Sequence, residues 1–560
     1  MSIIDQGYDI SISRLVFYPL LLAATGLWLL YRWQQQTRLF KMGNLLPGPT
    51  AVPLFGNALL AVGKKPDQLV TLGLSYAEKY GSVVRGWLGS KLIIFLTEPD
   101  DVEVILNSQV HIDKSTEYRF FKPWLGEGLL ISSGEKWRSH RKMIAPTFHI
   151  NILKSFMDIF NQNSRNVVNK MKKEAGKVFD VHDYMSGVTV DILLETAMGI
   201  TKETQDESGF DYAMAVMKMC DIIHQRHYKI WLRLDSIFKF TKFYEQQKKL
   251  LSIIHGLTNK VIKLKREKYV SNKDRGITET EVKKSSVNEP VLANEKTLAD
   301  TVFKGYRDDL DFNDENDVGE KKRLAFLDLM IESALNGTNK ITDHEIKEEV
   351  DTIMFEGHDT TAAGSSFTLC LLGIHQHIQD RVYNELYDIF GDSDRPVTFE
   401  DTLQMKYLER VLFEALRMYP PVPIIARKLN RDVKIPTKGY VLPAGATVVI
   451  GTLVIHRNPK YYKNPHVFDP DNFLPENTSN RHYYSYIPFS AGPRSCVGRK
   501  YALLKLKVLL ATVLRNYKVV SNVTEKEYVL QADIILKRTD GFRLQLEPRT
   551  RAIQRVAATL

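Results

Sequence analysis

Seventeen consecutive residues near the N-terminus, Leu15 to Tyr31, carry no charged side chain. At a rise of about 1.5 Å per residue, a helix of this length crosses the apolar core of a thin bilayer. Arg14 precedes the run, and the basic residues Arg32, Arg38 and Lys41 follow it. Because basic residues stay on the cytoplasmic side, we expect a single-pass signal anchor with the first residues in the lumen and the remaining chain in the cytoplasm. A cleaved signal peptide is the alternative, but the run is long and no A-x-A site follows it.

The composition excludes several classes of protein. With 44% hydrophobic and 25% charged residues, the 560-residue chain can bury a large core. Its three cysteines, Cys220, Cys370 and Cys496, are too few and too scattered for a disulfide framework or a zinc site, which indicates a reducing compartment. The formal charge is +10, but Lys and Arg are dispersed and form no basic stripe, so no nucleic-acid partner is expected. An anionic membrane surface or an acidic protein partner fits this charge better.

The chain divides into two parts at a proline-rich segment. Leu46-Pro47-Gly48-Pro49 predicts a stiff linker that ends the anchor. We therefore assign residues 1–43 to a lumenal tip and anchor, and residues 44–560 to one further domain. Helical patterns dominate that domain, with short strands predicted at Lys91 to Thr97 and at Ala446 to Ile455. The expected fold class is mainly α with small β-sheets.

One segment breaks the helical pattern. From Ser271 to about Lys322 the apolar periodicity is lost, and residues 308–320 carry seven acidic side chains with no Lys or Arg. We interpret residues 271–322 as an acidic, mobile insertion. A poorly patterned surface helix is the alternative interpretation.

Cys496 stands in a distinctive loop. The run from Phe489 to Gly498 reads FSAGPRSCVG and precedes the helical pattern YALLKLKVLL. Helix N-terminal amides and Arg494 are expected to favour the thiolate, which is the metal-binding form of cysteine. A lone cysteine is otherwise most often a small buried hydrophobic residue.

This run resembles the haem-binding loop of the cytochrome P450 superfamily, whose pattern Phe-x-x-Gly-x-Arg-x-Cys-x-Gly is filled at every position. The resemblance covers about Pro47 to the C-terminus. It implies the cytochrome P450 fold, with a single haem-thiolate catalytic domain behind the anchor. It further implies that the cofactor is haem b (iron protoporphyrin IX) and that the Cys496 thiolate is the axial iron ligand, which favours O–O cleavage.

A long helix is predicted to carry the oxygen chemistry. Thr342 to Glu345 forms a capping-box pattern, and a helical pattern of about 30 residues runs from there to His375. Its middle contains the poor helix formers of the run EGHDTT. We expect the Thr360 hydroxyl to bond the carbonyl of Glu356, leaving room for oxygen and water. Oxygen activation consumes two protons, so Asp359 and Thr360 are predicted to deliver them. The pair resembles the family's acid-alcohol pair; the alternative is that both residues merely interrupt a surface helix.

Glu356 lies one turn before Thr360 and on the same helix face. An unpaired carboxylate against an apolar macrocycle costs several kcal/mol, and an ester bond to a haem methyl would remove its charge. The string from Glu349 to Thr361 resembles family 4, in which this glutamate can become covalently attached to haem. Within family 4, the acidic insertion resembles the insect G subfamily, whose members convert long-chain aldehydes to hydrocarbons by oxidative decarbonylation.

The resemblance also implies donors for the two haem propionates, which need cations or N–H groups when buried. Trp137 and Arg141 match the family's Trp-x-x-x-Arg helix, and Arg427 and Arg494 match two further donors. Each arginine taken alone is more often a solvated surface residue.

A second motif concerns the scaffold. Glu414 and Arg417, at i and i+3 on one helix ended by Pro420-Pro421, resemble the superfamily's structural Glu-x-x-Arg pair. An exposed salt bridge is the ordinary alternative for this spacing. The third member of the family's ion-pair triad is an arginine, but this chain has Asn472 in the matching segment. That departure puts the triad in doubt.

The leading hypothesis is a monooxygenase that receives electrons from NADPH through a separate NADPH-cytochrome P450 reductase, with cytochrome b5 as an additional candidate partner. A nucleotide fingerprint is missing, because Gly126-Glu127-Gly128 lacks the third glycine. The expected substrates are long-chain aldehydes, with terminal hydroxylation of fatty acids as the runner-up, at the endoplasmic reticulum membrane. The other classes considered are a peroxide-using haem-thiolate isomerase or lyase and a non-catalytic haem sensor or electron carrier.

Overall fold

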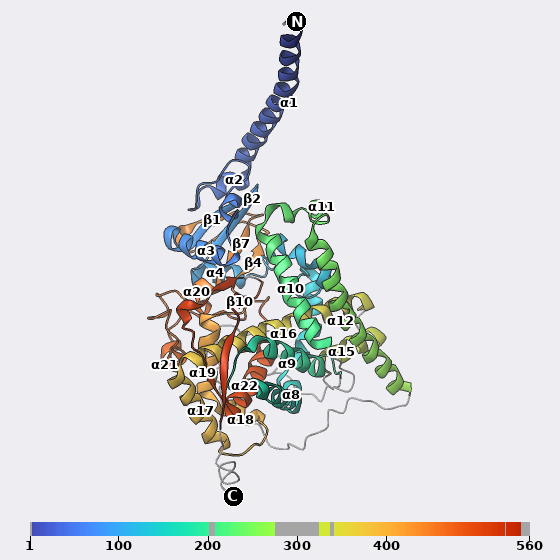
Figure 1. Ribbon diagram of the computed structural model, residues 1–560, viewed down its shortest axis with the longest axis vertical. Coiled ribbons are helices and arrows are strands. Elements are labelled where there is room, and N and C mark those ends of the chain that lie inside the picture. Colours follow the sequence, from blue (N-terminus) through green and yellow to red (C-terminus); the bar gives the residue numbers. More distant parts are fainter. Residues whose placement is uncertain (1–2, 201–207, 275–323, 337–340, 533, 550–560) are drawn as a thin grey trace.

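A computed structural model describes residues 3–200, 208–274, 324–336, 341–532 and 534–549. Helix α1 (Ile3–Gln36) projects from the remaining structure, as Figure 1 shows. Its stretch from Leu15 to Gln36 is long and apolar enough to cross a membrane, with a mean hydropathy of 1.5. The most apolar part of this stretch is not buried against the protein, whereas Gln34 near its end is. The predicted apolar run from Leu15 to Tyr31 lies entirely within this helix.

The short helix α2 (Arg38–Gly43) packs on the body of the protein. Phe40 stacks on Trp87 of strand β1 (Val83–Leu88), with 4.4 Å between ring centroids. Thr37 caps α2, so α1 ends at Gln36 and the chain turns onto the body six residues before Gly43. The chain contacts the body as early as Gln34, whose side-chain amide donates to the Gly89 carbonyl at 3.2 Å, so these contacts begin before the domain boundary expected at residue 43.

The largest sheet lies close to the base of α1 (Figure 1). Its strand order is β1-β2-β7-β4, with β2 (Lys91–Leu96), β7 (Thr447–Ile450) and β4 (Ile425–Lys428). Strand β2 pairs parallel with β7, and the other two pairings are antiparallel. The strand predicted at residues 91–97 is confirmed. The strand predicted at residues 446–455 is wrong in its second half, because Gly451 caps a short helix α20 (Thr452–Ile455).

Helices form most of the rest. The helices around the core are α3 (Pro66–Tyr80), α4 (Pro99–Leu106), α5 (Lys122–Leu125), α6 (Gly134–Ile144), α7 (Ile150–Ser155), α8 (Met157–Met171), α9 (Val181–Thr196), α10 (Ser208–Tyr228), α11 (Asp235–Phe238), α12 (Lys242–Asp274), α15 (Phe326–Asn336), α16 (Asp343–Ile374), α17 (Gln376–Phe390), α18 (Phe399–Gln404), α19 (Lys406–Met418), α21 (Pro475–Thr478) and α22 (Arg499–Asn516). The smaller sheets contain β3 (Val178–Asp180), β11 (Arg543–Pro548) and β8 (Tyr517–Val520), then β9 (Leu530–Ala532) with β10 (Leu536–Arg538), and β5 (Val433–Lys434) with β6 (Val441–Leu442). The fold is mainly α with small sheets, as predicted.

Helix α16 runs through the middle of the helical part and contacts α9, α12, α19 and α22 (Figure 1). Its start is fixed by the predicted capping box: the Thr342 hydroxyl accepts from the Glu345 amide at 3.2 Å, and the Glu345 carboxylate accepts from the Thr342 amide at 2.9 Å. The helix ends at Ile374 with His375 as its C-cap. The long helix predicted from Thr342 to His375 is confirmed.

The predicted acidic insertion lies almost entirely outside the described residues. Its first four residues, 271–274, belong to the end of α12. Residues 271–274 contain no Gly or Pro that would stop a helix, so α12 extends three residues beyond Ser271, the predicted start of the insertion. Residues 275–322 carry no structural description.

Glu414 and Arg417 form a fully buried ion pair at the end of α19. The guanidinium donates to both carboxylate oxygens of Glu414, at 2.7 and 2.8 Å, and to the carbonyls of His456 and Pro465. Asn472 donates its side-chain amide to Glu414 at 3.1 Å, so a neutral hydrogen bond stands where a third charged residue was in doubt. The interpretation as an exposed salt bridge is excluded, since both side chains are 0% exposed.

Replacing Arg417 by Met should lower the free energy of unfolding by roughly 3–5 kcal/mol, because the Glu414 carboxylate stays buried without its cation. Equilibrium urea unfolding measures the loss. Arg410→Met on the same helix is the matched control; Arg410 pairs with the more exposed Asp471, so its loss should be below about 1 kcal/mol. Equal losses in the two variants would contradict this account of the buried pair.

Candidate functional site

The Cys496 loop is held by its own backbone. The Cys496 amide donates to the Phe489 carbonyl at 2.9 Å, and the Ser495 amide donates to the Gly492 carbonyl at 2.8 Å. Helix α22 begins directly after Gly498. Cys496 is exposed, although its neighbours Ser495 and Val497 are buried. The loop therefore presents the thiol as its accessible atom.

The protein alone does not favour the Cys496 thiolate. Burial by surrounding groups and the charge of Glu356 raise the pKa of the thiol to about 11, against weaker lowering by the Gly498 amide and then by Arg141 and Arg499. The Arg494 guanidinium lies over the ring of Trp137 and donates to the Ser132 carbonyl before α6, so its effect on the thiolate stays a prediction. A thiol that is exposed and yet desolvated faces an enclosed space. A bound cation would supply the charge that converts the thiol to its thiolate.

Glu356 and Thr360 share one face of α16, and the charge of Glu356 acts on Cys496. Both side chains keep accessible surface in a helix that is otherwise mostly buried. Burial raises the pKa of Glu356 to about 7, with the Lys114 charge opposing. The Thr360 hydroxyl donates to the Glu356 carbonyl at 2.9 Å, which confirms the predicted hydrogen bond.

Asp359 turns away from this face towards α10. Its side chain is 6% exposed, and the thiol of Cys220 donates to its carboxylate with 3.9 Å between sulfur and oxygen. Asp359 and Thr360 are neighbours in sequence, but consecutive side chains on a helix point in directions about 100° apart. The Asp359 carboxylate therefore lies in the protein interior, on the α10 side of the Thr360 hydroxyl.

Trp137 and Arg141 of α6 lie next to the cysteine loop. Both are 5% exposed, and the Arg141 guanidinium donates to the Ser495 carbonyl at 2.8 Å. The Arg494 guanidinium stacks on the Trp137 ring at 4.7 Å and donates to the Ser132 carbonyl at 2.8 Å. These three predicted residues are therefore gathered at one place.

Arg427 joins them from strand β4, together with a residue that the sequence did not single out. Arg427 is 2% exposed, and its backbone pairs with that of Lys114 in an isolated bridge. Burial, together with the charges of Arg427 and Arg494, holds the pKa of Lys114 well below its usual value. Lys114 belongs to no motif, so only its position in the fold identifies it.

The residues around Cys496 fit the haem that the motif implies. Arg141, Arg427, Arg494 and Lys114 bring four basic side chains close to Cys496 and Glu356, and the carboxylate of Asp113 also acts on Arg494. The Nε atom of Arg494 is buried and has no hydrogen-bond partner among the described residues. Two propionates match this surplus of buried donors, and the exposed thiol matches an iron ligand.

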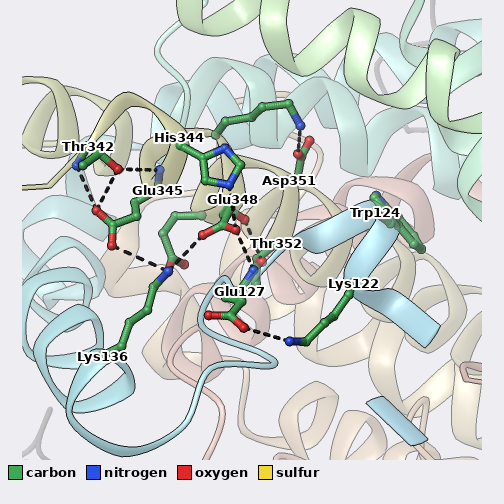
Figure 2. A network of polar contacts seen from close by, with 12 residues as sticks. Lys122, Trp124, Glu127, Lys136, Thr342, His344, Glu345, Glu348, Asp351 and Thr352 are labelled. Carbon is green, nitrogen blue, oxygen red and sulfur yellow. Dashed lines mark hydrogen bonds and ion pairs between the residues drawn. The ribbon is translucent and has the colours of Figure 1, made fainter. Parts of the chain in front are cut away.

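Two glutamates of α16 fasten α6 and the loop before it. Figure 2 shows Glu348 between the Glu127 backbone and Lys136, at 2.8 and 3.0 Å. Glu349, 0% exposed, accepts from the Leu129 amide at 3.0 Å and contacts the His140 ring at 2.7 Å. In the sequence, Glu349 stands out only as the first residue of the string that resembles family 4. The structure shows that it positions the helix that carries Trp137 and Arg141.

Gly128 permits this close approach. A Cβ atom at Gly128 would lie 2.2 Å from the Thr352 hydroxyl and 2.6 Å from the Glu348 carbonyl oxygen. The loop Gly126-Glu127-Gly128, which lacks the third glycine of a nucleotide-binding motif, therefore has a packing role: it lets the backbone lie directly on α16.

Comparison with known proteins shows which family the chain matches. A family model described as Cytochrome P450 matches residues 46–546. Cytochrome P450 4g15 of Drosophila melanogaster is 54% identical over 576 residues, covering 98% of this chain and 100% of the relative. Cytochrome P450 4g1 of the same species is 52% identical, covering 96% of each chain. Cytochrome P450 4V2 of Homo sapiens is 37% identical, covering 92% of this chain and 91% of the relative.

Replacing Gly492 by Ala should destabilise the folded protein by more than about 3 kcal/mol, because the new Cβ would lie 1.8 Å from the Leu106 carbonyl oxygen in a backbone of positive φ. Gly445 also has positive φ but open space around it, so Gly445→Ala should cost only about 1–2 kcal/mol of backbone strain. Urea unfolding of both variants measures the difference. Similar losses would show that backbone strain alone explains Gly492.

Proposed function

Because the chain belongs to the cytochrome P450 family, and within it to family 4, we propose that it oxidises long-chain aliphatic substrates, with fatty aldehydes as the main class. The protein is a cytochrome P450 monooxygenase. The finer proposal is oxidative decarbonylation, which turns the aldehyde into a hydrocarbon one carbon shorter. Terminal hydroxylation of fatty acids is the second candidate, since it uses the same apolar substrates and the same site.

The observation that carries the proposal is the common face of Glu356, Thr360 and Cys496. The two α16 side chains share one helix face, and charge coupling links Glu356 to Cys496. A thiol ligand opposite a helix alcohol is the arrangement that oxygen activation needs. A sensor or an electron carrier needs no such alcohol, and an isomerase consumes no outside protons.

Haem would be held by the side chains gathered around Cys496. The Cys496 thiolate would bind the iron, and Arg141, Arg427, Arg494 and Lys114 would meet the propionates. Trp137 would position Arg494 by stacking. When bound, haem supplies the redox chemistry that activates dioxygen with two electrons from NADPH, which the reductase transfers. Cytochrome b5 is a candidate second electron donor.

The remaining steps fall to the chain's own residues. The Thr360 hydroxyl, anchored on the Glu356 carbonyl, would pass a proton into the enclosed space and accept one from the interior. Asp359 would resupply it from the α10 side, where its carboxylate is buried beside Cys220. Asp359 is buried and Thr360 is partly buried. This setting limits water to the few molecules that deliver protons, which protects against premature peroxide release.

We place the chain on the endoplasmic reticulum membrane. The exposed apolar stretch Leu15–Gln36 can span a bilayer, and the basic residues that follow the apolar run favour the cytoplasmic side for the body. A membrane-bound body draws its long aliphatic substrates from the lipid phase. The net charge of +10 adds attraction to an anionic membrane surface.

Reconstitution with the reductase and NADPH tests the proposal. An aldehyde and a fatty acid of equal chain length are supplied separately, and the products are identified by mass spectrometry. We expect a hydrocarbon one carbon shorter than the aldehyde. Hydroxylated acid alone would favour the second candidate, and turnover of hydroperoxides without NADPH would place the protein in the isomerase class.

Cys496→Ala should abolish the thiolate-type spectrum of the ferrous carbonyl complex and all turnover, because the other two described cysteines are buried elsewhere, Cys370 with its pKa raised to about 12 by burial. Absorption spectroscopy of the reduced, carbonyl-treated protein measures this. Cys370→Ala serves as the control and should keep the spectrum. A thiolate-type spectrum in Cys496→Ala would disprove the ligand assignment.

Glu356 should become esterified to a haem methyl during turnover, because dioxygen would take up the two electrons and the hydrogen that the methyl C–H loses as the carboxylate oxygen forms the new C–O bond. The ester would remove a charge that burial already disfavours, since burial raises the pKa of Glu356 to about 7. Acidified organic solvent should then fail to extract haem from active enzyme. Glu356→Gln provides the control and should release all of its haem. Complete extraction from the wild type after turnover would refute the linkage.

A further inference from the structure

Lys505 lies fully buried in α22, nine residues after Cys496. Its ammonium donates to the carbonyl oxygen of Gly357 at 2.8 Å. It also lies 4.9 Å from the centroid of the Tyr501 ring, one turn earlier on the same helix. Among the described residues it forms no ion pair, so a buried cation is satisfied here by one carbonyl and one aromatic face.

Lys507, two residues further on, shows the usual arrangement. Its ammonium pairs with Glu409 at 3.0 Å and donates to the Thr402 carbonyl at 2.8 Å. An unpaired buried ammonium is costly, whereas a paired one is tolerated. The two lysines share a helix and a buried setting, and only Lys505 contacts α16. Its cost therefore points to a role beyond packing.

The Gly357 carbonyl is an important acceptor. It also receives the hydroxyl of Thr361 at 2.9 Å, four residues later on α16. The segment between these two residues contains Asp359 and Thr360, the pair proposed to deliver protons. A donor fixed from α22 therefore holds the backbone on which that pair stands.

We propose that Lys505 is a positioning residue, which fixes the Gly357 carbonyl and thereby the Asp359-Thr360 segment for proton delivery. The inference rests on the proposed function of that pair. Lys505 links α22, the helix that follows the cysteine loop, to α16, so one hydrogen bond joins the two helices on either side of the site. Lys505 acts through the backbone and touches neither substrate nor cofactor.

The bond should respond to pH. Burial lowers the pKa of Lys505 to about 7, so the side chain is an ammonium below this pH and a neutral amine above it. The titratable groups that face it are Tyr501 on its own helix and His358 on α16, whose pKa burial lowers to about 4 and which is therefore neutral. A charged donor makes the stronger hydrogen bond, so the Gly357 carbonyl is held more firmly below pH 7.

The test compares the holoenzymes of the wild type, Lys505→Met and Lys507→Met. Amide hydrogen exchange of the α16 peptide around Gly357 is measured by mass spectrometry, with the Leu369 to Gly373 peptide as internal reference. Loss of a hydrogen bond from a charged donor should speed exchange by about tenfold in Lys505→Met only. Unchanged exchange, or the same increase in Lys507→Met, would overturn the proposal.

Coupling supplies the second readout. In the wild type, product formed per NADPH should fall as pH rises through about 7, with peroxide rising in exchange. Lys505→Met should form several-fold less product per NADPH at every pH and lose this inflection, while Lys507→Met keeps the wild-type profile. If Lys505→Met does not fold, the wild-type profile still decides, since a flat profile contradicts the role of Lys505.

Thr360→Ala separates this inference from the function on which it rests. If Thr360→Ala uncouples turnover but Lys505→Met behaves like Lys507→Met, the positioning role is wrong and the proton pair stands. If Lys505→Met speeds exchange near Gly357 while Thr360→Ala stays fully coupled, the positioning of α16 stands and the proposed role of Thr360 fails.

Discussion

Several polar groups buried along α16 find partners on other elements, and these partners hold the site together. Glu348 and Glu349 bind the loop and helix that carry Trp137 and Arg141. Further along, the Gly357 carbonyl takes the ammonium of Lys505 from the helix after the cysteine loop. A helix with an apolar surface all round could slide against its neighbours at little cost, whereas unpaired buried charges cost several kcal/mol each. The polar contacts therefore fix the register of α16 against α6 and α22, and with it the distance between Thr360 and Cys496.

The features that could be predicted from the sequence are those set by local rules. The capping box at Thr342 fixes where α16 begins, because its two hydrogen bonds span only three residues. The hydroxyl of Thr360 reaches Glu356 because residues four apart lie one turn apart. The cysteine loop was recognisable because the run from Phe489 to Gly498 fills every position of the family's haem-loop pattern. The predicted strand after Ala446 was too long, because the β-branched residues around Gly451 do not show that a helix begins there.

The features that could not be predicted depend on residues far apart in the chain. Arg494 lies two residues before Cys496 in sequence, yet its guanidinium contacts Trp137 and the Ser132 carbonyl, which lie far away in the chain. Lys114 and Lys505 resemble ordinary surface lysines in sequence, and only the fold buries them. Asp359 was grouped with Thr360 by adjacency, while the helix turns its carboxylate towards Cys220 on α10. Sequence spacing identifies which residues carry chemistry, and the tertiary structure decides towards which partner each one points.

The charge balance around Cys496 explains why the fold and its cofactor depend on one another. Burial lowers the pKa values of Lys114, Arg427 and Arg494, and the charge of Arg427 lowers those of the other two further. Glu356 opposes these cations with a carboxyl that is only partly ionised near neutral pH. A protein interior accepts such a surplus only when an anion compensates it. A dianionic group that binds there is therefore favoured by the repulsion it relieves as well as by the bonds it forms. By linkage, the same binding energy stabilises the folded chain. The residues proposed to hold the haem thus carry an electrostatic cost that a bound dianion would relieve.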